Sequence, residues 1–256
     1  KSAAGNRSDT FNSMNNSITR SWRARLGDPM VAAVCALGVV QITAWGTSYY
    51  CLGVLAGPIS LDTGWSSSLV YFGFTAALLA MGIVSAWVGR AIDRHGARAV
   101  MCAGTGIVSA GLLALSMVRT EAAYLAAWVL IGLGMRLCLY DAAFAALVQV
   151  VPSRGRRAIS YLTLFGAFAS SVFWMLGHLL NEAVGWRETL VLFAAINLVV
   201  CLPLIWFGLA RREAAPRSGS GMAATSWWPT IRLPGPGATV WRSPTFPTQW
   251  AMPTRS

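Results

Sequence analysis

Six apolar runs, each long enough to cross a lipid bilayer as a helix, succeed one another between residues 30 and 209. A hydrocarbon core of about 30 Å takes about 20 helical residues to cross. Lipid offers the backbone no hydrogen-bond partners, so each run has to satisfy its own peptide groups as a helix. The sequence therefore predicts an all-α membrane protein, a bundle of six transmembrane helices. The runs are Met30–Gly57, Ser67–Val88, Ala97–Val118, Ala122–Val148, Ala158–Leu180 and Thr189–Leu209.

Charged residues make up only 11% of the chain, and their positions predict how the helices are oriented. Eleven arginines flank the runs on alternate loops and ends, against two on the opposite loops, which is the bias expected of cytoplasmic segments. Both termini are therefore predicted to be cytoplasmic. The net charge of +11 is explained by topology and by contact with anionic lipids, so no nucleic-acid partner is expected. The cytoplasmic arginines are Arg20, Arg23, Arg25, Arg90, Arg94, Arg98, Arg154, Arg156, Arg157, Arg211 and Arg212, and the outer ones are Arg119 and Arg187.

The chain is predicted to divide into three parts. Residues 1–28 form a polar leader that is predicted to be disordered and cytoplasmic, and residues 29–212 form the six-helix bundle. Residues 213–256 are rich in Pro, Trp and Arg and contain no run long enough to span a bilayer. Dense proline prevents regular helix and strand pairing. This tail is either a disordered segment or an out-of-frame translation, and the sequence leaves both interpretations open.

No pattern in the sequence is typical of an enzyme, a metal site or a cofactor site. A remote alternative is an intramembrane serine protease, which needs a serine nucleophile and a partnered histidine. The nearest approach is Gly46-Thr47-Ser48 together with His178, and it lacks the glycine that follows the nucleophile. The cysteines all fall within apolar runs, where free cysteine behaves as a small hydrophobe, so neither disulfides nor metal ligation are expected. They are Cys35, Cys51, Cys102, Cys138 and Cys201.

The loop after the second run carries the most informative motif, Gly89-Arg90-Ala91-Ile92-Asp93-Arg94-His95-Gly96-Ala97-Arg98. It resembles the signature of the major facilitator superfamily, Gly-x-Leu-Ala-Asp-Arg-x-Gly-Arg-Arg, with Gly89, Asp93, Arg94, Gly96 and Arg98 matching in place. The two glycines are expected to permit a tight turn and a close approach of helices. Asp93 is expected to accept hydrogen bonds at a helix start and so to favour one state of a cytoplasmic gate.

Other stretches extend the resemblance. Gly185-Trp186-Arg187 precedes the last run as in bacterial members, and Gly64-Trp65-Ser66 and Arg136–Ala143 look most similar to the monocarboxylate and oxalate–formate type branch. The likeness covers Met30–Arg212, the amino-terminal half of a twelve-helix fold.

The resemblance implies half of a secondary transporter in the plasma (bacterial inner) membrane. It implies transport of a small solute, an organic anion, by alternating access, with proton coupling as one option and with a need for a second six-helix half. The alternative is a truncated, non-transporting remnant or an accessory membrane protein.

Polar residues inside the fourth run are candidates for chemistry. A central arginine costs about 2.5–3.5 kcal/mol on insertion scales, so Arg136 is expected to face a cavity or a partner. On a continuous helix Asp141, five residues on, lies about 140° around the axis and makes a poor partner, whereas Tyr140 shares the face of Arg136. Arg136 and Tyr140 are therefore candidates for binding an anion and Asp141 for a proton or gating site. A purely structural role for Arg136 and Asp141 stays open.

The first run carries polar residues at helical spacing. Gln41, Trp45, Ser48 and Tyr49 are predicted to line one face of a substrate cavity. The alternative is hydrogen bonding between helices, which contributes about 0.6–2 kcal/mol per contact in membranes.

Overall fold

The computed structural model describes residues 28–210, and these residues are helical apart from short turns, with no strand among them. Five stretches are long and apolar enough to cross a bilayer, and a bent pair of helices makes a sixth. The predicted all-α class is confirmed, and the second of the six spans is the bent pair. The predictions for the leader and the tail concern residues 1–27 and 211–256, which lie outside the described part.

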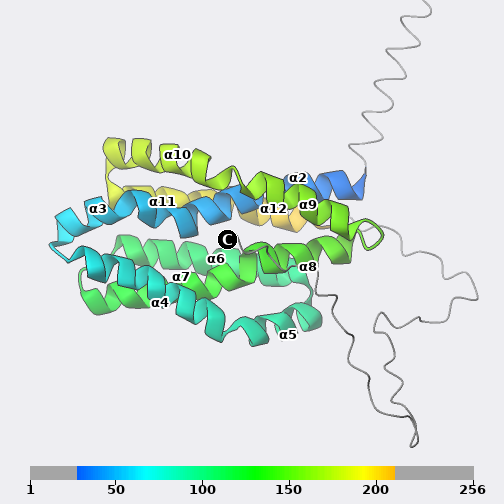
Figure 1. The fold of residues 1–256 in the computed structure, drawn as a ribbon, viewed down its shortest axis with the longest axis horizontal. Coiled ribbons are helices and arrows are strands. Elements are labelled where there is room, and N and C mark those ends of the chain that lie inside the picture. Colours follow the sequence, from blue (N-terminus) through cyan, green and yellow to red (C-terminus); the bar gives the residue numbers. More distant parts are fainter. Residues whose placement is uncertain (1–27, 211–256) are drawn as a thin grey trace, which may run out of the picture. The chain divides into compact units, whose positions relative to one another are not determined.

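Several spans are interrupted by an extended residue, a bend or a π-helical segment (Figure 1). The first span is longer than its apolar run predicts, because it continues through Pro58 to Gly64, whose φ of 72° ends it. In chain order the elements are α2 (Pro29–Ala44), η1 (Trp45–Tyr50) and α3 (Cys51–Thr63); α4 (Ser67–Ile83) and α5 (Ser85–His95); α6 (Ala97–Ser116); α7 (Glu121–Cys138) and α8 (Tyr140–Val150); α9 (Gly155–Gly166) and α10 (Ala169–Val184); and α11 (Trp186–Ile196), η2 (Asn197–Cys201) and α12 (Leu202–Gly208).

The α7 helix packs against both α4 and α6, and α6 also contacts α11. On the other side of the bundle α2 packs against α9, and α3 packs against α10 (Figure 1). At Gly132 of α7 a Cβ atom would overlap the backbone of Ala77 on α4, so glycine is required for this approach. Small residues at such crossings are typical of membrane helices, because lipid supplies no hydrophobic force to hold looser contacts together.

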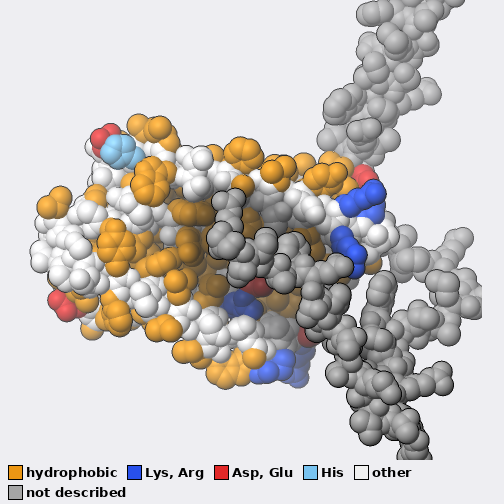
Figure 2. Space-filling view, viewed as in Figure 1, with side chains coloured by type: hydrophobic (Ala, Val, Ile, Leu, Met, Phe, Trp, Pro, Cys, Tyr) orange, Lys and Arg blue, Asp and Glu red, His pale blue; other side chains and the backbone are white. Residues whose placement is uncertain are grey.

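Apolar side chains also cover much of the outside of the bundle. Large hydrophobic residues of α9 and α10, such as Leu164, Trp174 and Met175, are more than half exposed. Figure 2 shows orange side chains spread over the visible face, with most of the visible Lys and Arg side chains at the end where α5 and the start of α9 lie and one near the middle of the face. This distribution suits a protein surrounded by lipid along its length and by water and headgroups at that end.

The signature loop differs in part from its prediction. The second span is not straight, because α4 and α5 meet at an angle of 54°. Gly89 lies inside α5, where an added Cβ would meet nothing within 4 Å, so the predicted close approach at this glycine is wrong. Asp93 sits near the end of α5 rather than at a helix start, which corrects the role expected of it. Gly96 does make the turn, with a φ of 80° that favours glycine.

Candidate functional site

The fourth span is broken at Leu139. This residue is extended, with φ −78° and ψ −162°, and it separates α7 from α8. Leu139 N–H donates to the Met135 carbonyl at 3.0 Å, and Ala143 N–H donates to the Leu139 carbonyl at 3.1 Å. Between these two bonds the regular ladder is interrupted, so the side chains before and after the break no longer follow the spacing of one helix.

The break brings Arg136 and Asp141 together. Nη1 of Arg136, in the last turn of α7, donates to Oδ2 of Asp141, in the first turn of α8, and the two form an ion pair. The prediction that Asp141 points about 140° away from Arg136 is therefore wrong, because it assumed a continuous helix. The same break removes the spacing on which the shared face of Arg136 and Tyr140 was predicted.

Arg136 also reaches the bend of the second span. Its Nη2 donates to Ser85 Oγ at 2.7 Å, and Ser85 is the first residue of α5. Nε of Arg136 is buried and has no hydrogen-bond partner among residues 28–210. The Arg136 side chain is 20% exposed and that of Asp141 is 60% exposed, so the pair is open to solvent mainly at the carboxylate. One guanidinium thus ties together the irregular points of two spans.

Aromatic rings gather around the start of α8. The rings of Trp45 and Tyr140 lie 5.2 Å apart between centroids, and Tyr140 stacks on Phe144 at 5.1 Å. Tyr49 meets the edge of Phe74 on α4 at 5.0 Å. Trp45, Tyr49 and Tyr140 are each partly exposed. These rings form an aromatic wall that joins the first, second and fourth spans.

Gln41 and Ser48 do not reach the surface. Both side chains are fully buried. Gln41 Nε2 donates to the Cys138 carbonyl at 2.9 Å and its Oε1 accepts from Trp45 Nε1 at 3.2 Å, while Ser48 Oγ donates to the Ala44 carbonyl at 2.6 Å. The prediction that these two residues line a cavity is corrected, because their polar atoms already have partners inside the bundle.

The signature loop is held by contacts that the motif alone does not predict. The backbone N–H of Ala97 donates to Oε1 of Gln149, at the end of α8, at 3.1 Å. The guanidinium of Arg98 stacks on the ring of Trp206 in α12 at 4.0 Å, a cation–π contact. Asp93 and Arg94 are exposed, and within residues 28–210 neither makes an ion pair.

The chain matches a family model described as Major Facilitator Superfamily over residues 37–252. The chain belongs to the Major Facilitator Superfamily. Among curated proteins it is 26% identical over 184 residues to the multidrug resistance protein MdtL of Escherichia coli O127:H6 (strain E2348/69 / EPEC), covering 72% of this chain and 46% of that protein. The MdtL proteins of Escherichia coli O45:K1 and Escherichia fergusonii are 25% identical over the same shares. The chain thus spans about half the length of the curated relatives it matches.

Membership in the Major Facilitator Superfamily makes the chain a multi-pass membrane protein of a transporter family, not an enzyme. The geometry is at odds with the protease alternative. His178 Nε2 pairs with Glu182 of its own helix at 3.3 Å, and Ser48 is bonded to its own helix. Within the described residues, no three His, Cys, Asp or Glu side chains come together as a metal site.

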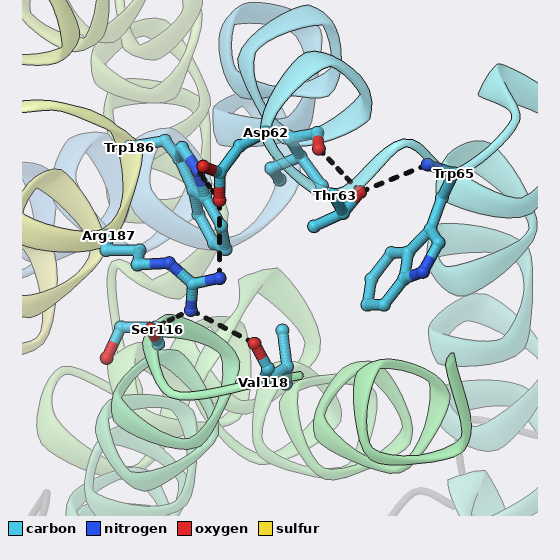
Figure 3. A network of polar contacts seen from close by, with 8 residues as sticks. Asp62, Thr63, Trp65, Ser116, Val118, Trp186 and Arg187 are labelled. Carbon is cyan, nitrogen blue, oxygen red and sulfur yellow. Dashed lines mark hydrogen bonds and ion pairs between the residues drawn. The ribbon is translucent and has the colours of Figure 1, made fainter. Parts of the chain in front are cut away.

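A polar network closes the end of the bundle opposite the signature loop (Figure 3). Nη1 of Arg187 donates to the carbonyls of Ser116 and Val118 at 2.8 and 3.0 Å. Asp62 accepts from Arg187 Nη2 at 3.3 Å and from Trp186 Nε1 at 3.2 Å. The network borders a pocket of about 650 Å³. Arg187 therefore fastens the start of α11 to the end of α6 and to α3.

Asp28 and Arg154 form a second clamp, between the start of α2 and the loop before α9. Both guanidinium Nη atoms of Arg154 donate to the carboxylate, at 2.7 and 2.8 Å. The hydrogen bond from Arg154 and a second from Met30 N–H hold the pKa of Asp28 below its usual value. Neither this clamp nor the Asp62–Arg187 pair could be predicted from the sequence, because the partners lie more than 100 residues apart and no local pattern joins them.

Proposed function

We propose that the chain is the amino-terminal half of a secondary active transporter that moves a small organic anion by alternating access. The observation that carries the proposal is Arg136, a partly exposed positive charge at the meeting point of two irregular spans. A desolvated carboxylate needs a fixed positive partner, and arginine stays charged at physiological pH while offering a fork of donors. Interrupted spans that end at the substrate are a common way for secondary transporters to build such sites.

The start of α8 supports the same substrate class. The extended residue Leu139 leaves the first N–H groups of α8 out of line with the carbonyls of α7. The amino end of a helix carries a partial positive charge, which attracts anions. Asp141 occupies this position and bonds to Arg136, so a substrate carboxylate would take the place of a carboxylate that is already there.

Asp141 is therefore the candidate proton or gating site. While Asp141 is charged it neutralises Arg136, and a substrate anion has to compete with it. Protonation of Asp141 releases the guanidinium, so binding of the anion is linked to uptake of a proton. The 60% exposure of the Asp141 side chain leaves it accessible to protons from solvent.

The aromatic wall favours a second candidate substrate, a lipophilic drug-like compound. Trp45, Tyr49 and Tyr140 offer flat apolar surface with polar edges, which suits ligands recognised by stacking rather than by charge. The relatives carry the name multidrug resistance protein, which points the same way. For such a substrate the rings would be the main contacts and Arg136 would be part of the gate.

Binding to the purified chain in lipid nanodiscs distinguishes the two candidates. For an organic anion, Arg136→Lys keeps the charge but loses the fork and should weaken binding, and Arg136→Ala should weaken it about tenfold to hundredfold, the equivalent of one charged hydrogen bond. Arg119→Ala, which removes an exposed arginine elsewhere, is the matched control and should leave affinity unchanged. A loss of thermal stability with unchanged affinity in the folded fraction would refute the substrate role of Arg136.

The orientation and the second half belong to the same proposal. We infer that both termini are cytoplasmic, in a bacterial inner membrane with anionic lipids at that face. Cysteine labelling in intact cells should then reach position 66 but not position 153, and labelling of Ser153→Cys from outside would contradict the topology. Asp93, an acid near the carboxyl end of a helix, is unfavourably placed by itself, so its partner is expected in a second six-helix half. In a complete protein Asp93→Asn should impair transport without impairing insertion.

A further inference from the structure

Gln41 joins the first span to the broken part of the fourth. Its side chain is fully buried, and both ends of its amide are used. Nε2 donates to the Cys138 carbonyl at 2.9 Å, and Oε1 accepts from Trp45 Nε1 at 3.2 Å. The residue thus contacts the last carbonyl of α7 on one side and the aromatic wall on the other.

The Cys138 carbonyl needs this donor because of the break. In a continuous helix it would accept from the N–H of Ala142, but the ladder is interrupted at Leu139 and resumes with Ala143 N–H. Cys138 is buried, so no water is at hand to replace the lost bond. A buried carbonyl without a partner is costly, and inside a membrane bundle the nearest remedy is to rebuild the helix.

We propose that Gln41 is a positioning residue that holds the fourth span in its broken form. By donating to the Cys138 carbonyl, Gln41 stabilises the broken form relative to a form in which α7 and α8 are one continuous helix. The break in turn is what sets Asp141 against Arg136 and puts Tyr140 beside Trp45. What the Arg136 site binds rests on the proposed function, whereas the effect of Gln41 on the break does not.

Hydrogen exchange of the backbone amides tests the proposal on the full chain in nanodiscs. Gln41→Met keeps the length and burial of the side chain but removes its donor and acceptor. Without the donor, α7 and α8 should merge, and the amides of Tyr140, Asp141 and Ala142 should exchange about tenfold more slowly as they gain helical partners. Unchanged or faster exchange at these three amides would overturn the proposal.

Two further variants separate positioning from general loss of structure. Ser48→Ala also removes a buried hydrogen bond from the first span, but that bond stays within its own helix, so exchange at the start of α8 should not change. Gln41→Asn keeps an amide on a side chain that is too short to reach the Cys138 carbonyl. It should therefore slow exchange as Gln41→Met does, and wild-type exchange in this variant would contradict the role of the bond.

Binding measurements then tell a failure of this inference from a failure of the proposed function. If both hold, anion binding depends on pH through Asp141 in the wild type, and Gln41→Met flattens that dependence because the ion pair is lost. If exchange slows but no anion binds even to the wild type, the positioning role stands and the proposed substrate falls. If exchange slows in Gln41→Met while anion binding keeps its wild-type pH profile, the positioning role stands and the role proposed for Asp141 falls.

Discussion

A buried hydrogen bond between the two π-helical segments should measurably stabilise the bundle. Asn197, at the start of η2, is 1% exposed, and Thr47, inside η1, is fully buried. Asn197 Nδ2 donates to Thr47 Oγ1 at 2.8 Å and to the Phe193 carbonyl at 2.9 Å. The first of these bonds joins the first and sixth spans at the point where both depart from regular helix into π-helical segments, which are rare in proteins.

The expected size of the effect follows from this geometry. Hydrogen bonds between membrane helices average about 0.6 kcal/mol in double-mutant cycles, with a maximum of about 1.7 kcal/mol. Because both partners are buried and the bond is short, we expect a coupling of about 1–1.7 kcal/mol between Asn197→Ala and Thr47→Ala in the free energy of unfolding. The assay is reversible unfolding in lipid bicelles of the two single variants, the double variant and the wild type.

The matched control pairs Thr47→Ala with Thr189→Ala. Thr189 is also fully buried, but its hydroxyl donates locally, to the carbonyl of Gly185 at the N-cap of its own helix, at 2.7 Å. Effects at this pair should add to within about 0.3–0.5 kcal/mol. If Asn197→Ala and Thr47→Ala add equally well, the bond does not stabilise the junction and the reasoning is refuted.

Three other predictions follow from single contacts. Asp28→Asn keeps the helix cap but loses the ion pair with Arg154, so the wild type should be more stable by about 0.2–1 kcal/mol at neutral pH, as for a partly exposed pair. The folded-state pKa of Asp28 is lowered, so the extra stability of the wild type should be fully present at pH values above 3.8, the usual pKa of the group. It should be lost as the pH falls through the folded-state pKa. A difference in melting temperature that does not change with pH would contradict this prediction. Gly166→Ala should displace Tyr140, because the ring carbon Cζ would lie 2.7 Å from the new methyl group. The free energy of unfolding should fall by about 1 kcal/mol. Gly106→Ala is the control: a methyl group there would meet nothing within 4 Å, so the same assay should show no loss of stability or a gain. The 256-residue chain alone should show no transport in proteoliposomes, and robust uptake would mean that two copies act as a dimer of halves.

The sequence by itself determined the class of fold and the positions of the spans. Each apolar run has to be helical because lipid cannot satisfy its backbone, whatever the other runs do. The turn at Gly96 could also be predicted locally, because a turn with a positive φ favours glycine. The signature motif around it also led to the family.

The candidate site depended on tertiary structure. No proline or glycine at Leu139 indicates the break in the sequence. The hydrogen bond to the Cys138 carbonyl comes from Gln41, which is 97 residues away. The pairing of Arg136 with Asp141 could not be predicted, since helical spacing gave the opposite answer once the helix was assumed to be continuous. The clamp between Asp62 and Arg187 likewise joins residues 125 positions apart. Hydrophobicity acts on each segment separately, so the sequence of a segment is enough to predict its helix. A buried polar side chain that bonds to another helix needs a partner within hydrogen-bond distance, and only the folded bundle brings that partner there.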